Sequence, residues 1–231
     1  GRKVHLHRGA RNGVEGGVGS ERDPSERSKS TRSPCDDPSM PTSPTVLRSG
    51  RVLLRRWTAA DRPVFAAMNA DPIVMEYFPS ALDRSESDAF VDRIEAHFDT
   101  AGFGLWAVEI VSSGAFAGFV GLWPAAFDAH FTPAIEVGWR LRSDVWGNGY
   151  ATEAARLALD DGFSRLGVDE IVSFTAAVNQ PSRRVMEKLG MRRDPLDDFE
   201  HPSVAVGSSL RTHVLYRLAA DDWTVDRPEL T

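Results

Sequence analysis

The chain has 231 residues, a net charge of −6 and a single cysteine, Cys35. The acidic balance argues against general nucleic-acid binding, and a lone cysteine excludes an internal disulfide bond. No apolar run reaches about 18 residues, so we expect no membrane span. The charged start of the chain is not followed by an apolar segment, unlike a secretory signal. We therefore expect a cytoplasmic protein with no membrane or nucleic-acid partner.

Residues 1–45 predict a disordered tail or a leader. They contain no aromatic residue and are rich in Gly, Ser, Pro and Arg. Such a segment cannot bury enough apolar surface to offset its conformational entropy. Two alternatives remain open, a natural flexible tail or sequence upstream of a start at Met40. Residues 46–223 are predicted to form the folded domain and residues 224–231 a flexible C-terminus.

Regular hydrophobic patterns run through residues 46–223. Apolar residues three or four apart predict helices, and short runs of β-branched and aromatic residues predict strands. Thr58 is the expected N-cap of the first helix, and Gly102 and Gly167 follow the ends of the next two. In chain order, the predicted elements are a strand at 51–57, helices at 58–70 and 85–102, strands at 105–110, 115–123 and 134–141, a helix at 151–166, a strand at 170–178, a helix at 180–190 and a strand at 211–218. This order indicates one mixed α/β domain.

The segment "DVWGNGYATEA", residues 144–154, places two glycines where a helix begins. The first N–H groups of a helix have no partner within the helix, and the helix dipole favours negative charge there. Gly147 and Gly149 would let the backbone approach a bound anion closely. From these residues alone, a tight turn between strand and helix is an equal alternative. Neither the Walker loop nor the dinucleotide-binding fingerprint is matched.

The same segment resembles the acyl-CoA loop of the GNAT N-acetyltransferases, especially their RimJ/RimL-like branch. The resemblance spans about residues 46–220 and includes the motifs "LLRRWTAAD", "FVGLW", "IEVGWRL" and "NQPSRRVMEKLGM". It implies a single domain with a mostly antiparallel central sheet, splayed between its fourth and fifth strands, and helices on both faces. It also implies acetyl-CoA as cosubstrate, with no metal.

In this family the pantetheine arm pairs with backbone of the fourth strand, and the diphosphate binds amides of the loop. The implied cofactor-binding residues are Trp139, Leu141, Trp146, Gly147, Asn148, Gly149, Tyr150, Ala151, Thr152, Asn179 and Ser182. Asn179 is also well suited to cap the helix that follows it, and both roles are compatible.

Glu136 is the candidate general base. Strand alternation places it on one face with Gly138 and Arg140, where partial burial would raise its pKa. The alternative is a surface glutamate paired with Arg140. Ser182 is the candidate acid for the leaving thiolate, because Met186 stands where many family members carry a tyrosine.

The resemblance implies direct transfer of an acetyl group to a primary amine, on a protein N-terminus or a small molecule. A non-catalytic acyl-CoA-binding or sensor module is the alternative. The acidic segment 194–200 would either attract a cationic amine or form a solvated run of charge. His97, His201 and His213 lack the spacing of metal ligands, and an exposed strand edge leaves a homodimer open.

Overall fold

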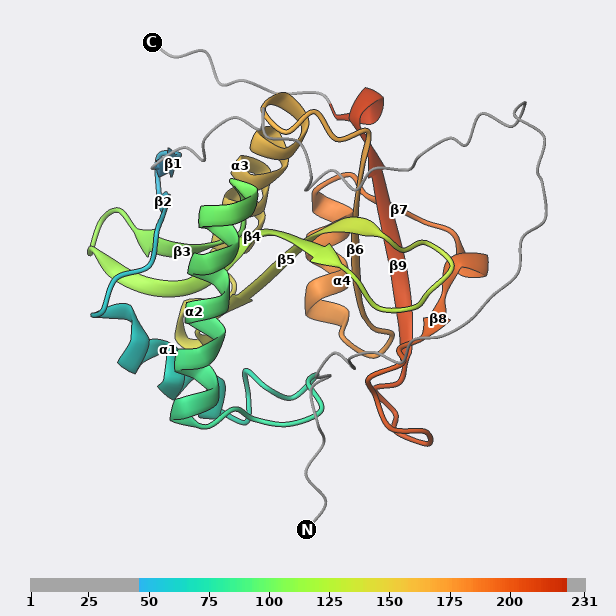
Figure 1. The fold of residues 1–231 in the computed structure, drawn as a ribbon, viewed down its shortest axis with the longest axis horizontal. Coiled ribbons are helices and arrows are strands. Elements are labelled where there is room, and N and C mark those ends of the chain that lie inside the picture. The colour runs from blue at the N-terminus through green and yellow to red at the C-terminus, as the bar shows by residue number, and fades with distance from the viewer. Residues whose placement is uncertain (1–45, 224–231) are drawn as a thin grey trace, which may run out of the picture. The chain divides into compact units, whose positions relative to one another are not determined.

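The computed structural model describes residues 46–223, so the predicted tail and C-terminus lie outside the described residues. Figure 1 shows the arrangement of the elements. In chain order these are β1 (Val46–Arg48), β2 (Val52–Arg55), α1 (Asp61–Ala70), α2 (Arg84–Ala101), β3 (Leu105–Ile110), β4 (Ala115–Ala125), β5 (Ala134–Leu141), the 3₁₀ turn η2 (Ser143–Val145), α3 (Tyr150–Ser164), β6 (Glu170–Ala176), α4 (Gln180–Lys188), β7 (Arg192–Arg193), η3 (Pro195–Asp197), β8 (Phe199–Glu200), β9 (Thr212–Ala219) and η4 (Ala220–Asp222). None of these helices is long and apolar enough to cross a membrane.

One sheet organises this part of the chain. Its strand order is β1-β2-β3-β4-β5-β6-β9-β7, with β8 also on β9. Every pair is antiparallel except β5 and β6, which are parallel and share a single registered pair, Glu136 with Val172. The two strands separate beyond this pair, so the expected mixed α/β class and splayed sheet are confirmed.

Helices cover both faces of the sheet, as expected. The ring of Phe119 in β4 contacts Phe65 of α1 and Phe90 of α2 at centroid distances of 6.0 and 5.9 Å. Leu122, three residues further, points to the opposite face. There Gly162 of α3 lies so close that a Cβ on it would come within 2.9 Å of the Leu122 side chain. Figure 1 shows α2 crossing in front of β3 and β4.

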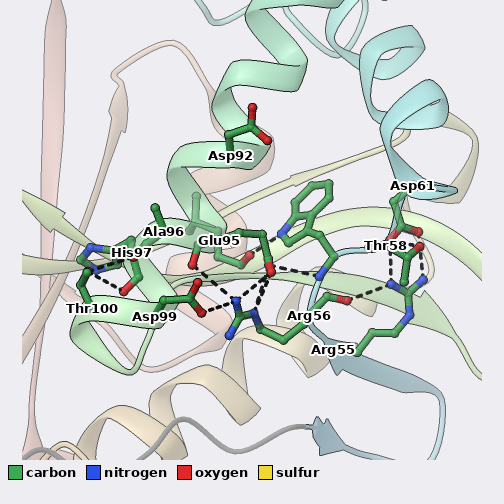
Figure 2. Close-up of polar contacts among 12 residues, drawn as sticks. Arg55, Arg56, Thr58, Asp61, Asp92, Glu95, Ala96, His97, Asp99 and Thr100 are labelled. Carbon is green, nitrogen blue, oxygen red and sulfur yellow. Dashed lines mark hydrogen bonds and ion pairs between the residues drawn. The ribbon is translucent and has the colours of Figure 1, made fainter.

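Two arginines at the end of β2 fasten α1 and α2 to the sheet (Figure 2). Arg55 donates from both terminal nitrogens to Asp61, at 2.7 and 2.9 Å. Arg56 binds Glu95 and Asp99 of α2. These contacts orient the helices that cover the face bearing Phe119.

The predicted N-cap Thr58 is wrong. Helix α1 begins at Asp61, and its cap residue, Ala60, makes no side-chain capping bond. Instead, the Asp61 carboxylate accepts hydrogen bonds from the Thr58 amide and hydroxyl (Figure 2). The ion pair with Arg55 also holds this carboxylate, so a side-chain contact just ahead of the helix replaces the expected cap at Thr58.

Several short elements were not predicted. Strands β1, β7 and β8 have two or three residues, too few to show a period of two. Strand β6 ends at Ala176 rather than 178, because a turn in which Asn179 donates its amide to the Ala176 carbonyl follows. The final strand is shifted by one residue, to Thr212–Ala219.

An aromatic cluster covers part of the sheet that no helix covers. The 126–133 connection between β4 and β5 crosses in front of β6 and β9 (Figure 1). Its Phe127 contacts Phe174 of β6 and Phe199 of β8 at centroid distances of 5.4 and 5.9 Å. His201 and His213 pack against the same rings. These contacts join the two halves of the sheet on the side of Glu136.

Candidate active site

The glycine loop ends in a row of unused backbone donors. Gly147 and Gly149 have φ angles of 79° and 81°, which side chains with a Cβ rarely adopt. Helix α3 starts directly after them. The first backbone hydrogen bond at this start runs from the Glu153 amide to the Gly149 carbonyl. The amides of residues 147–152 donate to no other group among the described residues. This arrangement is suited to binding an anion with main chain.

The loop is held in shape by its own side chains and by β2. Trp146 donates its indole N–H to the Leu141 carbonyl at 2.9 Å, and Asn148 donates its side-chain amide to the Val145 carbonyl at 3.0 Å. Arg51 donates to the Asn148 carbonyl and forms an ion pair with Glu153. Glu153 also accepts from Ser49 and the Arg51 amide, so its role is structural.

A basic pocket of about 380 Å³ adjoins this loop. Its walls include Arg51, Arg156 and Lys188, together with Gly149, Thr152 and Glu153. The sequence analysis missed the three cations. Helical spacing could have revealed one of them, because residues 149, 152, 153 and 156 lie on one face of α3. Arg51 comes from the turn between β1 and β2 and Lys188 from α4, which sequence spacing does not relate to α3.

The outer half of β5 has unpaired backbone on the side facing β6. The Arg142 amide donates to the Ala117 carbonyl at 2.8 Å, continuing the ladder with β4. Since donor direction alternates along a strand, the backbone groups of Trp139 and Leu141 point away from β4. Beyond Glu136, β6 supplies no partner to them. The predicted pairing positions therefore lie along the splay.

Glu136 lies where β5 and β6 part. It is half-buried, and its carboxyl group extends over Gly138, with Oε1 at 3.7 Å from the position of a Cβ there. No hydrogen bond or ion pair joins it to another described residue. Burial alone raises the pKa of Glu136 to about 8. A carboxyl group with this pKa can accept a proton near neutral pH.

The alternative pairing of Glu136 with Arg140 is not observed. Arg140 instead donates from Nη1 to the Asn69 side-chain carbonyl at 2.7 Å. Its guanidinium lies 4.0 Å from the ring centroid of Phe78, in the connection between α1 and α2. Burial lowers the pKa of Arg140 to about 10. Both charged groups on this face of β5 therefore lack a charged partner from the described chain.

Asn179 caps α4 and orients Ser182. Its side-chain carbonyl accepts from the Ser182 amide at 3.2 Å, which confirms the capping role. Its amide nitrogen donates to the hydroxyls of Thr175 and Ser182 at 2.9 and 3.1 Å. Both amide hydrogens are thus used, and the Ser182 hydroxyl keeps its own proton for another acceptor. Met186, one turn further, is buried in the core and offers no proton.

The acidic segment 194–200 is neutralised by neighbouring side chains. Asp197 pairs with Arg217 and lies 3.2 Å from His130, Asp198 pairs with Arg193, and Glu200 pairs with Arg211. These partners leave little net field to attract a cationic amine. Within residues 46–223, no group of His, Cys, Asp or Glu is arranged to hold a metal ion.

The predicted residues converge because parallel strands end at the same edge of a sheet. The loop follows β5, and Asn179 and Ser182 follow β6. Helices α3 and α4 meet beside them, where Arg156 donates to the Lys188 carbonyl at 3.2 Å. The structure thus brings the loop, the free edge of β5, Glu136 and Ser182 around one splay.

Comparisons with known proteins agree with this arrangement. The chain is 32% identical over 148 residues to the uncharacterised protein YkkB of Bacillus subtilis, covering 64% of this chain and 85% of that protein. It is 27% identical over 174 residues to the uncharacterised N-acetyltransferase YnaD of the same organism, covering 75% and 96%. Mycobacterium smegmatis RimJ in complex with CoA-disulfide has a similar fold, with a TM-score of 0.60, 18% identity and coverage of 77% and 87%. Residues 51–192 match the family described as acetyltransferase (GNAT) domain. The chain belongs to this acetyltransferase family.

Proposed function

We propose that this enzyme transfers an acetyl group from acetyl-CoA directly to a primary amine, bound together in one ternary complex. The observation that carries the proposal is the row of unused amides at 147–152, placed at the same splay as a carboxyl group with a raised pKa. Oriented main-chain donors suit the diphosphate of CoA. The backbone of Trp139 and the amide of Leu141, which point away from β4, suit the amide-bearing pantetheine arm.

The RimJ/RimL-like assignment remains part of this proposal. It is supported by the motif at residues 146–154 and by the segment that contains Asn179 and Ser182. The structural likeness to RimJ concerns the fold. In that branch the acceptor is a protein N-terminal amine, and small-molecule amines are the alternative. A cytoplasmic location and a homodimer likewise stay predictions.

Each candidate side chain has one task in the transfer. Glu136 accepts the proton that the amine loses as its nitrogen attacks the acetyl carbonyl and the C–N bond forms. The C–S bond then breaks, and its electron pair leaves with sulfur. In this proposal Ser182 donates a hydrogen bond or proton to this thiolate, which is supported by the hydroxyl proton that its contact with Asn179 leaves unused. A thiol pKa of about 8.5 makes the thiolate a fair leaving group without a strong acid.

The basic pocket predicts salt-dependent cofactor binding. Replacing both Arg156 and Lys188 by Ala should weaken the affinity for CoA about tenfold at low salt, because two cations near the phosphates are lost. The difference should shrink as salt screens the charges. Calorimetry at two salt concentrations measures it. Arg84→Ala, which removes an exposed cation of α2, is the matched control. Equal CoA affinity in the double variant and the control would contradict the assignment of this pocket.

A thiol-release screen tests the proposed function. Acetyl-CoA is incubated with the protein and with pooled small amines and N-terminal peptides, and free CoA thiol is measured. The proposal expects release that depends on one or more of these amines. Tight binding of acetyl-CoA without release in any pool would favour the non-catalytic binding module instead.

A further inference from the structure

Arg140 is a half-buried cation for which the described chain supplies no anion. Its Nε is buried without a hydrogen-bond partner, and its one hydrogen bond goes to the neutral amide of Asn69. The guanidinium is covered by Phe78 and by Phe119, at 4.0 and 5.5 Å from the ring centroids. No acidic side chain among residues 46–223 lies within ion-pair distance of it. Taking a charge out of water without a counter-charge is unfavourable, and the neutral link to Asn69 does not require a cation.

The same face of β5 also carries an acidic group without a charged partner, Glu136. Glu136 faces Trp123 and Arg140 faces Phe119 across the β4–β5 ladder, so both point to the side of α1 and α2. Gly138 lies between them. Within 4 Å, a Cβ at Gly138 would meet only the Glu136 carboxyl group, so no other side chain packs directly on this glycine. Strand β5 therefore presents two groups without an ion-pair partner, the Glu136 carboxyl group and the Arg140 guanidinium, on either side of Gly138.

The separation of the two groups suits one small zwitterion. Side chains at positions 138 and 140 are roughly 7 Å apart on a strand, and the Glu136 carboxyl group already reaches position 138. A molecule that contacts both groups must therefore be small, with its amine and its carboxylate only a few bonds apart. The acidic segment 194–200, which is paired with arginines, does not compete as a binding site for the amine.

We propose that the acceptor is an amine that also carries a carboxylate, with Arg140 binding the carboxylate while Glu136 faces the amine. This inference rests on the proposed function and adds the substrate class. In this proposal Arg140 is a specificity-determining residue, because it contacts the acceptor but takes no part in forming the C–N bond or breaking the C–S bond. The unused N–H groups of its terminal nitrogens are the donors.

Matched acceptors test the inference. Initial rates of thiol release are measured with amino acids and with the carboxamides of the same amino acids, which keep the amine and lose the negative charge. The unaltered enzyme should show a kcat/KM at least about tenfold higher for the amino acid, as expected for a charge-assisted hydrogen bond. In Arg140→Met, which keeps an apolar stem between the two rings, this ratio should fall to about 1. Arg140→Lys, which keeps the charge, should retain part of the preference.

Arg142→Met is the matched control, since Arg142 lies two residues after Arg140, directly beyond the end of β5, and already pairs with Asp144. It should leave the ratio unchanged. Release with carboxamides at rates equal to those with amino acids overturns this inference and leaves the proposed function standing. A preference that survives in Arg140→Met also overturns it. No release with any acceptor, although acetyl-CoA binds, overturns both. If Arg140→Met does not fold, the ratio in the unaltered enzyme and in Arg140→Lys decides.

Discussion

Replacing Glu136 by Gln should lower kcat by about 10² to 10⁴, the usual contribution of a positioned general base. The amide keeps the size of the side chain but cannot accept the proton of the attacking amine. In the unaltered enzyme, kcat/KM should rise with pH and level off above an apparent pKa near 8, the value to which burial raises the pKa of Glu136. Steady-state rates between pH 6 and 9.5 check both expectations.

The same substitution should stabilise the fold at high pH. The folded state holds a proton on Glu136 up to about pH 8, whereas the unfolded chain releases it near the ordinary glutamate pKa of 4.5. Stability is therefore lost as pH rises from the unfolded pKa through the folded pKa. Glu136→Gln removes this loss. The two pKa values convert to at most about 5 kcal/mol, and because the side chain is only half-buried, the variant's free energy of unfolding at pH 9 should exceed that of the unaltered enzyme by on the order of 2 kcal/mol.

Glu170→Gln provides the control, because Glu170 is an exposed glutamate of β6 that pairs with Arg217. It should change neither kcat nor the pH dependence of stability by much, as exposed ion pairs contribute little. Denaturant titrations at pH 5 and pH 9 compare the variants. Full activity in Glu136→Gln, or a stability that varies with pH as in the unaltered enzyme, would rule out the assigned base.

Replacing Gly147 by Ala should weaken acetyl-CoA binding at least about tenfold. A residue with a Cβ adopts a φ of 79° only at a cost of about 1 kcal/mol or more, so the loop relaxes and its amides turn away from the diphosphate. Each lost hydrogen bond to a charged group costs about 1.5 to 3 kcal/mol. Calorimetric titration with acetyl-CoA measures the change.

Gly114→Ala separates strain from binding. Gly114 has a φ of 65° in the turn between β3 and β4, and a Cβ at either glycine would meet open space. Both variants should therefore lose similar stability in thermal unfolding. Only Gly147→Ala should lose affinity for acetyl-CoA. Equal affinities in the two variants would show that the glycine loop is no more than a turn.

Local pattern was enough to predict the strands whose apolar runs are clearly bounded. The bounds of β3 and β5 match the prediction residue for residue, and a glycine precedes β3 and a proline precedes β5. The cap prediction failed at Thr58 because the Asp61 carboxylate binds Arg55 and the Thr58 amide, and the helix begins at Asp61. Residue type alone does not show which of these nearby groups the carboxylate will bind.

The candidate site likewise has features that are local in sequence and features that depend on contacts from distant segments. The glycines of the loop and the cap at Asn179 are recognisable from residue type and spacing, because their conformations are local. The isolation of Arg140 depends on Phe78 and Asn69, which arrive from the α1–α2 region. Strand alternation placed Arg140 beside Glu136 and suggested an ion pair. Only the folded structure shows that each group lacks a partner of opposite charge.

Amide resonances of the loop give the most direct test of how the enzyme holds its cofactor. The account predicts that titration with CoA shifts the ¹⁵N–¹H signals of residues 147–152 in a saturable manner, with Trp139 and Leu141 next in size. The amides of Gly114 and its neighbours serve as the internal reference and should not move. Saturable binding that leaves the signals of 147–152 unchanged would contradict the assignment of the diphosphate to the start of α3.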